Sequence, residues 1–250
     1  MCAGTSPPTL RLYRWSERAL TIGYGQDRDR DVDCAACRAR GIAVIRRVTG
    51  GRAVLHDAEV TYSVSAPKGL PGFGSGLDEA YRRIAAGLSA GLRKLGVGVD
   101  GAAPAPAPAP VTPASRGPRH AGCFASRARH EIGVGGRKIV GSAQRREAGG
   151  FLQHGSILLA SHAPALAQVL RGGPVHGDAA MAGLAEVLPA PPTPEAVAAA
   201  VVAGCAAAWD VRFEPAGPSL AEVREARSLE RGRYRSEGWN AGRRPGAAPR

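Results

Sequence analysis

The amino-acid sequence predicts an α/β (α+β) fold, in which helices pack on a mixed, largely antiparallel sheet. Two patterns indicate this class. Short segments rich in apolar and β-branched residues recur between turn residues, as strands do. One long segment instead repeats apolar residues at steps of three and four, as an amphipathic helix does. With 250 residues, 44% of them hydrophobic, the chain can form one substantial core.

Five segments of the N-terminal part have strand patterns: LRLYRW (10–15), ALTIGYG (19–25), IAVIRR (42–47), AVLHD (53–57) and VTYSVSAP (60–67). The first two predict a strand pair, and the last two predict strands on either side of a turn at Asp57–Glu59. Before the third segment, residues 31–40 predict a short helix that is capped by Asp31 and ended by Gly41.

A long helix follows these strands. Ser75 and Asp78 resemble a capping box at its start, and Gly96 ends it. The apolar stripe that we expect to face the core consists of Leu77, Tyr81, Ile84, Leu88, Leu92 and Leu95.

Residues 102–119 form a Pro/Ala-rich tract, which we interpret as an insertion within a domain because strand patterns resume directly after it. Turns at Gly135–Gly136 and Ala148–Gly150 then separate three predicted antiparallel strands, HEIGV, RKIVGSAQRRE and FLQHGSILLA. Further along, Thr193 followed by Pro194 predicts the start of another helix.

The net charge of +12 favours an acidic partner, either a nucleic acid or a protein. The arginines are scattered, aromatic residues make up only 5%, and no helix-turn-helix, zinc-finger or RNA-recognition pattern is present, so nucleic acid is the less favoured partner. The sequence contains no run of about 18 apolar residues that would predict a membrane span. Because the N-terminus does not resemble a secretion signal either, we expect a cytoplasmic protein.

Cysteine and lysine usage points to one pair of residues. Cys34 and Cys37 form a C-x-x-C without a second metal-binding pair, and we interpret them as two cysteines on a short helix. Cys123 and Lys138 flank a predicted strand, so a hairpin can bring the lysine near the thiol. An ammonium group lowers the pKa of a thiol and makes it nucleophilic. The alternative is that Cys123 is buried and inert.

The segment RRVTGGRAVLHD (46–57) is both cationic and rich in glycine. Gly50 and Gly51 allow a ligand to approach the backbone closely, although they are also compatible with a simple tight turn. Arg46, Arg47 and Arg52 favour contact with a substrate or its carrier over a solvated surface.

Four blocks in this order, RRVTGGRAVLHDAEVTYSV, CFAS, GRKIVGSAQRR and FLQHGSILL, resemble the lipoyl and octanoyl transferase/ligase superfamily. The resemblance is closest to its octanoyltransferases, which move octanoate from acyl carrier protein to the glycine cleavage H protein. It runs from about Leu10 to Asn240 and implies the fold of the biotin/lipoate protein ligase catalytic domain. We therefore expect a catalytic acyltransferase domain over residues 1–189, a small C-terminal subdomain over 190–240 and a tail over 241–250.

The resemblance also implies site residues. Cys123 would carry the octanoyl (or lipoyl) group as a thioester, and Lys138 would lower the pKa of its thiol. The group would then pass to a lysine of the H protein or another lipoyl domain, with no ATP, cofactor or metal ion. The implied substrate-binding residues are Arg46, Arg47, Gly50, Gly51, Arg52, His56, Gly141, Ser142, His154 and Gly155. The resemblance also implies that the loop over residues 47–56, called the glycine loop below, covers the acyl chain as a lid.

Two other functions remain open. An ATP-dependent lipoate–protein ligase is the first, although ligases usually have three glycines where this chain has Gly50-Gly51-Arg52. The second is a non-catalytic carrier-binding or nucleic-acid-binding module. The chain also departs from the family, since no N-M-A-x-D-E segment precedes Thr9–Trp15; we expect either a start further upstream or a fold without that element.

Overall fold

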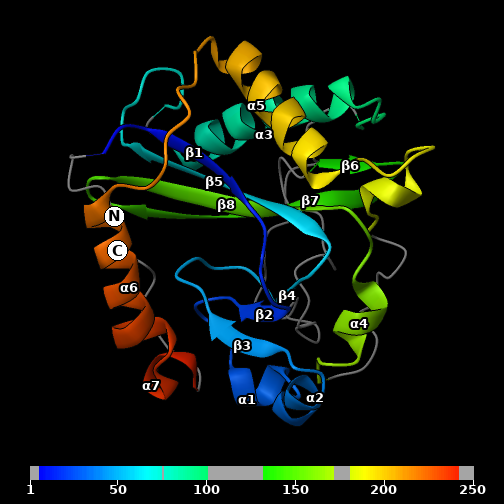
Figure 1. The fold of residues 1–250 in the computed structure, drawn as a ribbon, viewed down its shortest axis with the longest axis vertical. Helices are drawn as coiled ribbons and strands as arrows, with labels where there is room; N and C mark the ends of the chain where they lie inside the picture. Colours follow the sequence, from blue (N-terminus) through cyan, green and yellow to red (C-terminus); the bar gives the residue numbers. More distant parts are fainter. Residues whose placement is uncertain (1–5, 75, 101–131, 172–180, 242–250) are drawn as a thin grey trace, which may run out of the picture.

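The computed structural model describes residues 6–74, 76–100, 132–171 and 181–241. Their strands form two sheets, one of five strands in the order β1-β5-β8-β7-β6 and one of three in the order β3-β2-β4. Figure 1 shows α3 and α5 above the large sheet and the small sheet below it. None of the described helices is long and apolar enough to cross a membrane.

The large sheet is antiparallel throughout. Its strands are β1 (Thr9–Tyr13), β5 (Glu59–Pro67), β6 (Ile132–Val134), β7 (Arg137–Glu147) and β8 (Gly150–Leu158). The hairpin between β6 and β7 turns through Gly135 and Gly136, which both have positive φ angles that suit glycine. The three predicted strands after the Pro/Ala-rich tract are therefore confirmed.

Two helices, α3 (Leu77–Lys94) and α5 (Pro194–Trp209), cover one face of this sheet. Of the predicted apolar stripe of α3, Ile84, Leu88 and Leu92 are buried, whereas Leu77 is 49% exposed. The rest of the buried face consists of the small residues Ala80, Gly87 and Gly91. The predicted capping box is not seen, because the N-cap is Gly76 and Ser75 lies outside the described residues. α5 begins as predicted, with the Thr193 side chain accepting a hydrogen bond from the backbone of Ala196.

The small sheet places β2 (Ala19–Ile22) between a parallel β3 (Ala43–Arg46) and an antiparallel β4 (Val54–His56). The predicted pairing of the first two strands is therefore wrong: β1 pairs with β5, and β2 belongs to the other sheet. The chain also crosses from one sheet to the other between β4 and β5. α1 (Arg28–Asp31), α2 (Cys34–Ala39) and α4 (Ala163–Ala167) complete this layer, which has its own apolar core.

The predicted helix at residues 31–40 is two helices. Asp27 caps α1 and Asp33 caps α2, whereas Asp31, the predicted cap, ends α1. Cys34 and Cys37 lie on α2 as free thiols, as expected, and burial raises the pKa of Cys37 to about 11.

The C-terminal part continues with η4 (Leu184–Glu186), α6 (Leu220–Leu229), η5 (Glu230–Tyr234, a π-helical turn) and α7 (Glu237–Asn240). Within the expected C-terminal subdomain, α5 packs against α3 in the main core, whereas α6 buries no side chain. α7 returns to the small sheet and packs against β3.

Candidate active site

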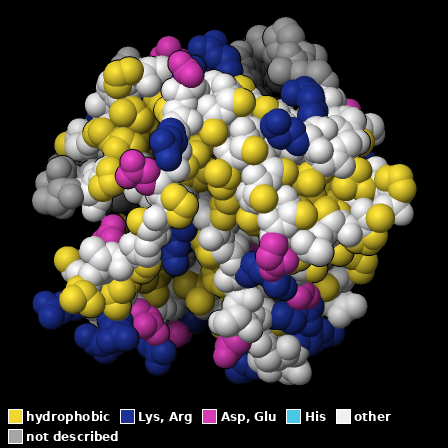
Figure 2. Space-filling view, turned by 45° about the horizontal axis from the view of Figure 1, so that its top comes forward, with side chains coloured by type: hydrophobic (Ala, Val, Ile, Leu, Met, Phe, Trp, Pro, Cys, Tyr) yellow, Lys and Arg dark blue, Asp and Glu magenta, His cyan; other side chains and the backbone are white. Residues whose placement is uncertain are grey.

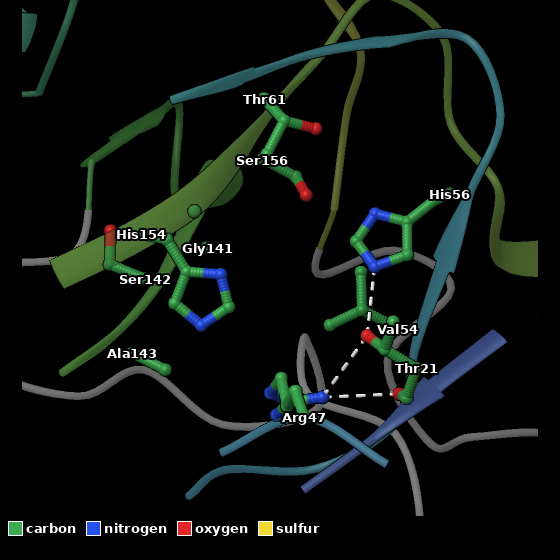
Figure 3. A pocket seen from close by; sticks show the side chains of 11 residues that line it. Thr21, Arg47, Val54, His56, Thr61, Gly141, Ser142, Ala143, His154 and Ser156 are labelled. Carbon is green, nitrogen blue, oxygen red and sulfur yellow. Dashed lines mark hydrogen bonds between the residues drawn. The ribbon is translucent and has the colours of Figure 1, made fainter. Parts of the chain in front are cut away.

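A cavity lies between the two sheets (Figure 3). β5, β7 and β8 of the large sheet contribute to it, as do β2, β4 and the segment after β3. Its walls consist of Thr21, Arg47, Val54, His56, Thr61, Gly141, Ser142, Ala143, His154, Gly155 and Ser156. The structure thus brings together residues from three of the four sequence blocks.

Strand register decides which side chains of the large sheet reach the cavity. Thr61, Ser156 and Gly141 are aligned across β5, β8 and β7, and directly paired residues point to the same face. The adjacent row, Val60, Ile157 and Val140, packs in the core beneath α3 and α5. The cavity is therefore on the sheet face that these two helices do not cover.

The side chain of Arg47 forms hydrogen bonds with the backbone of the glycine loop. It is 8% exposed, and its guanidinium donates to the carbonyl oxygens of Gly50 (2.8 and 3.2 Å), Arg52 (2.7 Å) and Thr21 (3.1 Å). Gly51 has a positive φ of 90°. Arg47 thus faces the cavity while it ties the loop to β2; Gly50, Gly51 and Arg52 do not line the cavity.

Arg46 has a different position from the one expected for a substrate contact. It is fully buried and does not line the cavity. Its guanidinium donates to carbonyl oxygens of two segments, the turn after β2 (Gly23, Tyr24, Gln26) and the end of α7 (Trp239, Asn240, Ala241). Arg46 therefore joins the turn after β2 to the end of α7.

Glu59 is a buried carboxylate beside the cavity, with a side chain that has no exposed surface. Its Oε1 accepts hydrogen bonds from Thr61 (2.5 Å) and Ser156 (2.9 Å) and lies 2.8 Å from Nδ1 of His56. Its Oε2 has no hydrogen-bond partner among the described residues. A buried acid with donors on one oxygen fixes the orientation of each of those donors.

His56 continues this network into the small sheet. Its Nε2 lies 2.8 Å from Oγ1 of Thr21, which also accepts from Arg47 at 3.3 Å. The ring of Trp15 stacks on the imidazole at 4.1 Å between centroids. Both ring nitrogens of His56 are therefore engaged, and a polar chain runs from Glu59 to Arg47 across the cavity wall, as Figure 3 shows in part.

His154 reaches the cavity from β8. Its Nε2 lies 2.6 Å from the hydroxyl of Thr49, a fully buried residue of the glycine loop. Burial, and after it the charge of Arg47 and the nearness of His56, lowers the pKa of His154 to about 3. The imidazole is therefore neutral at physiological pH.

Lys138 is 2% exposed and lies beside an irregularity of β7. Ile132 pairs with Val140 whereas Gly133 pairs with Lys138, so Ile139 is an extra residue that interrupts the alternation of side chains. Met181 forms a parallel bridge with Lys138 and packs in the apolar core of the small-sheet layer. Because bridge partners share a sheet face, we infer that the lysine side chain leaves β7 on the face that carries the cavity.

The predicted nucleophile, Cys123, lies outside the described residues. Its role therefore stays a prediction. Among the described residues, no group of three or more His, Cys, Asp or Glu side chains is placed to hold a metal ion.

Sequence reasoning missed several residues that build this site, above all Thr21, Thr49 and Glu59. Glu59 carried a detectable signal, since an acid three residues after His56, at the start of an apolar strand, needs buried partners. Thr49 stood inside the quoted loop, but its partner on β8 becomes apparent only in three dimensions.

Solved structures define the class of protein. The chain superposes on a crystal structure of lipoate-protein ligase A bound with ATP with a TM-score of 0.77, at 25% identity, over 94% of this chain and 86% of that one. A bi-partite lipoate protein ligase from Thermoplasma acidophilum gives a TM-score of 0.74, at 22% identity over 98% and 88% of the two chains. The fold is that of lipoate protein ligases, and the predicted fold class is confirmed.

Sequence comparison then gives the family. The chain belongs to the lipoyl protein ligase A/B catalytic domain family, whose model matches residues 1–206. Among relatives, it is 42% identical to octanoyltransferase LipM of Kyrpidia tusciae and 39% identical to octanoyltransferase LipM of Symbiobacterium thermophilum. Each alignment covers 95% of this chain and 88% of the relative.

Proposed function

We propose that the protein is an octanoyltransferase of protein lipoylation. It takes an octanoyl group from acyl carrier protein and passes it to a lysine of a lipoyl domain, with the glycine cleavage H protein as the first acceptor to test. The observation that carries this proposal is the 42% identity to an octanoyltransferase over 95% of the chain. The cavity supports it, since its walls come from the R-R-x-T-G-G, G-R-K and H-G-S blocks.

In the proposed reaction, Cys123 acts as the nucleophile. Its thiolate adds to the carbonyl carbon of the octanoyl thioester, the carrier leaves as a thiolate that takes up a proton from water, and the octanoyl group remains on Cys123. The acceptor lysine, as a free amine, then adds to the same carbon and releases one N–H proton to water, and the Cys123 thiolate leaves as the amide forms. The ammonium group of Lys138 would keep the thiolate ionised.

No energy source is needed for this sequence, because a thioester is converted into a more stable amide. We place the reaction in the cytoplasm. The described cysteines are free thiols, which fits a reducing compartment.

Intact-protein mass spectrometry tests the proposal. Wild-type protein mixed with octanoyl-acyl carrier protein, without ATP, should gain the mass of one octanoyl group on Cys123. Cys123→Ser should gain none, whereas Cys34→Ser, which removes a half-buried thiol in α2, should behave as wild type. Absence of acylation in the wild type, or octanoylation of the H protein by Cys123→Ser at the wild-type rate, would contradict the proposal.

An ATP-dependent ligase is the second candidate, and the structural similarity to a ligase bound with ATP favours it. The same mixture separates the two. Strict dependence of H protein modification on ATP and free octanoate or lipoate would establish the ligase.

A further inference from the structure

Two histidines face the cavity, and they differ in what their ring nitrogens can do. Both nitrogens of His56 lie at 2.8 Å from partners, Glu59 and Thr21. His154 has one such partner, Thr49, at its Nε2. Among the described residues, none hydrogen-bonds to its Nδ1. Figure 3 shows the His154 ring projecting from β8 toward the side of the cavity that His56 and Thr21 form.

The surroundings of Thr49 decide which nitrogen of His154 carries the proton. Thr49 is fully buried, and in the described part of the chain its hydroxyl meets no hydrogen-bond partner other than His154. If Nε2 carried the proton, the hydroxyl hydrogen of Thr49 would be buried without an acceptor, which is unfavourable. The favoured arrangement has the Thr49 hydroxyl donating to Nε2, so the proton of the neutral ring is on Nδ1.

His154 is also prevented from becoming a cation. The His154 side chain is partly buried, and the guanidinium of Arg47 adds repulsion, so its pKa falls to about 3. Arg47 is in turn fixed by the carbonyl oxygens of the glycine loop. A neutral imidazole held in this way can donate one hydrogen bond, but it is a poor acceptor of protons.

We propose that Nδ1–H of His154 donates a hydrogen bond to the carbonyl oxygen of the acyl group being transferred, and that Thr49 sets the tautomer that makes this possible. This inference rests on the proposed function. When a nucleophile adds to the carbonyl carbon, the π electrons move to the oxygen, where the hydrogen bond strengthens. They return as the leaving group departs, and the histidine neither gains nor loses a proton. His154 is then a catalytic residue and Thr49 a positioning residue.

Paired substitutions test this assignment through kcat and KM for octanoyl-acyl carrier protein. Removal of one donor to an oxyanion lowers kcat about 100-fold to 1,000-fold, and we expect the lower figure for His154→Ala. His154→Asn keeps an N–H near the Nδ1 position and should retain kcat to within about ten-fold, whereas His154→Gln puts its amide near Nε2 and should resemble alanine. KM should stay within about two-fold in each variant, since the donor acts mainly on the developing charge.

Thr49 offers a matched pair. Thr49→Ser keeps the hydroxyl and should remain within about two-fold of the wild-type kcat, whereas Thr49→Val should lower kcat by about ten-fold or more. Equal kcat values for the valine and serine variants, or for His154→Asn and His154→Ala, would overturn the inference.

The tautomer of His154 can also be measured by spectroscopy, without any enzymatic activity of the protein. Nuclear magnetic resonance of protein with ¹⁵N-labelled histidine distinguishes a protonated from an unprotonated ring nitrogen. We expect Nδ1 of His154 to carry the proton at pH 7 and Thr49→Val to lose this preference; a proton on Nε2 in the wild type would refute the inference. An inactive wild type with the expected tautomer would instead count against the proposed function alone.

Discussion

At the scale of single residues, buried polar side chains determine the shape of this site. Glu59, His56, Thr21 and Arg47 form one chain of hydrogen bonds that joins the large sheet to the small one. Each member orients the next, so the position of the glycine loop depends on an acid at the far end of the chain.

Removal of that acid should weaken the whole protein. Glu59→Ala leaves three buried donors without their acceptor, and we expect the free energy of unfolding to fall by about 3 kcal/mol. Glu59→Gln keeps one acceptor oxygen and should lose about half as much. Urea denaturation at pH 7 measures both variants, and equal stabilities of wild type and Glu59→Ala would contradict the network.

The low pKa of His154 predicts a pH dependence of stability. In the unfolded chain the imidazole binds a proton below about pH 6.5, but in the folded protein it does so only near pH 3. Unfolding therefore takes up a proton in this window, and stability falls as the pH drops, by about 1 kcal/mol per pH unit from this group.

The matched comparison is His154→Asn, which cannot titrate. Between pH 7 and pH 4.5, the free energy of unfolding of the wild type should fall more steeply than that of the variant. Parallel curves would show that His154 is protonated in the folded protein.

Sequence reasoning reached some of these residues and not others. Arg46 and Arg47 are neighbours in one motif, and the sequence pattern does not predict different positions for them. In the structure, Arg47 lines the cavity, whereas Arg46 is fully buried and does not line it. The difference arises because adjacent residues of an extended chain point in opposite directions and meet different elements.

At the scale of elements, close packing of α3 on α5 depends on glycines. A Cβ atom at Gly204 would lie 2.1 Å from the backbone nitrogen of Gly91 and 2.7 Å from the carbonyl oxygen of Gly87. The two helix backbones therefore meet directly, and no side chain fits between them.

Gly204→Ala should consequently lower the free energy of unfolding by about 2 kcal/mol, because overpacking outweighs the better helix propensity of alanine. Gly217→Ala is the control, since a Cβ there meets no atom within 4 Å among the described residues. Thermal denaturation of both variants checks this prediction. A Gly204→Ala variant as stable as the control would show that the helices can move apart without penalty.

α7 is held to β3 by hydrogen bonds in both directions. The side-chain oxygen of Asn240 accepts from the backbone N–H of Arg46 at 2.8 Å, and the indole of Trp239 donates to the Arg46 carbonyl oxygen at 2.7 Å. Asn240 also donates to the carbonyl oxygen of Tyr234 at 2.7 Å. The end of the C-terminal arm is thus fixed beside the glycine loop.

Asn240→Ala should lower the free energy of unfolding by about 2 kcal/mol, because it leaves a buried N–H without an acceptor. Glu237→Ala is the control on the same helix: its side chain is 74% exposed and its ion pair with Arg28 should contribute less than about 0.5 kcal/mol. Urea denaturation distinguishes the two. Similar losses in both variants would argue against a specific role of Asn240.

The elements themselves were largely predictable, but their partners were not. The patterns located β5, β7, β8 and α3, since burial on one face leaves a periodic signal, whereas the start of α5 was located from Thr193 and Pro194. They gave no information on which edge each strand would join, and so β1 and β2 were paired wrongly. Likewise, four aspartates near residue 30 can each cap a helix, and local sequence does not choose among Asp27, Asp29, Asp31 and Asp33.

At the scale of the whole molecule, the chain carries a net positive charge of +12. On the face in Figure 2, lysine and arginine side chains lie in several separate groups with acidic residues among them, rather than in one continuous stripe. With a net charge of +12, this distribution suits long-range attraction of an acidic carrier more than a nucleic-acid groove.

Salt should therefore weaken the encounter with the proposed donor, octanoyl-acyl carrier protein. Raising sodium chloride from about 50 to about 300 mM should lower kcat/KM for octanoyl-acyl carrier protein by about ten-fold. Octanoyl pantetheine, which lacks the protein part of the carrier, provides the control and should respond little. An equal response of both donors would remove electrostatic attraction as the explanation.

The fold class was predictable from sequence, whereas the division into two sheets was not. The turn predicted between β4 and β5 is instead a crossing between sheets, and the cavity exists because of that crossing. Such an arrangement is set by contacts between distant segments, which local patterns do not encode.

The contact between Arg46 and Asn240 joins positions 194 residues apart. During translation, the first of these leaves the ribosome long before the second has been synthesised. The support beneath the glycine loop is consequently completed only after α7 has been synthesised. A nascent chain that has not yet reached residue 240 should therefore lack this support, and we expect the loop to take its final position only after that point.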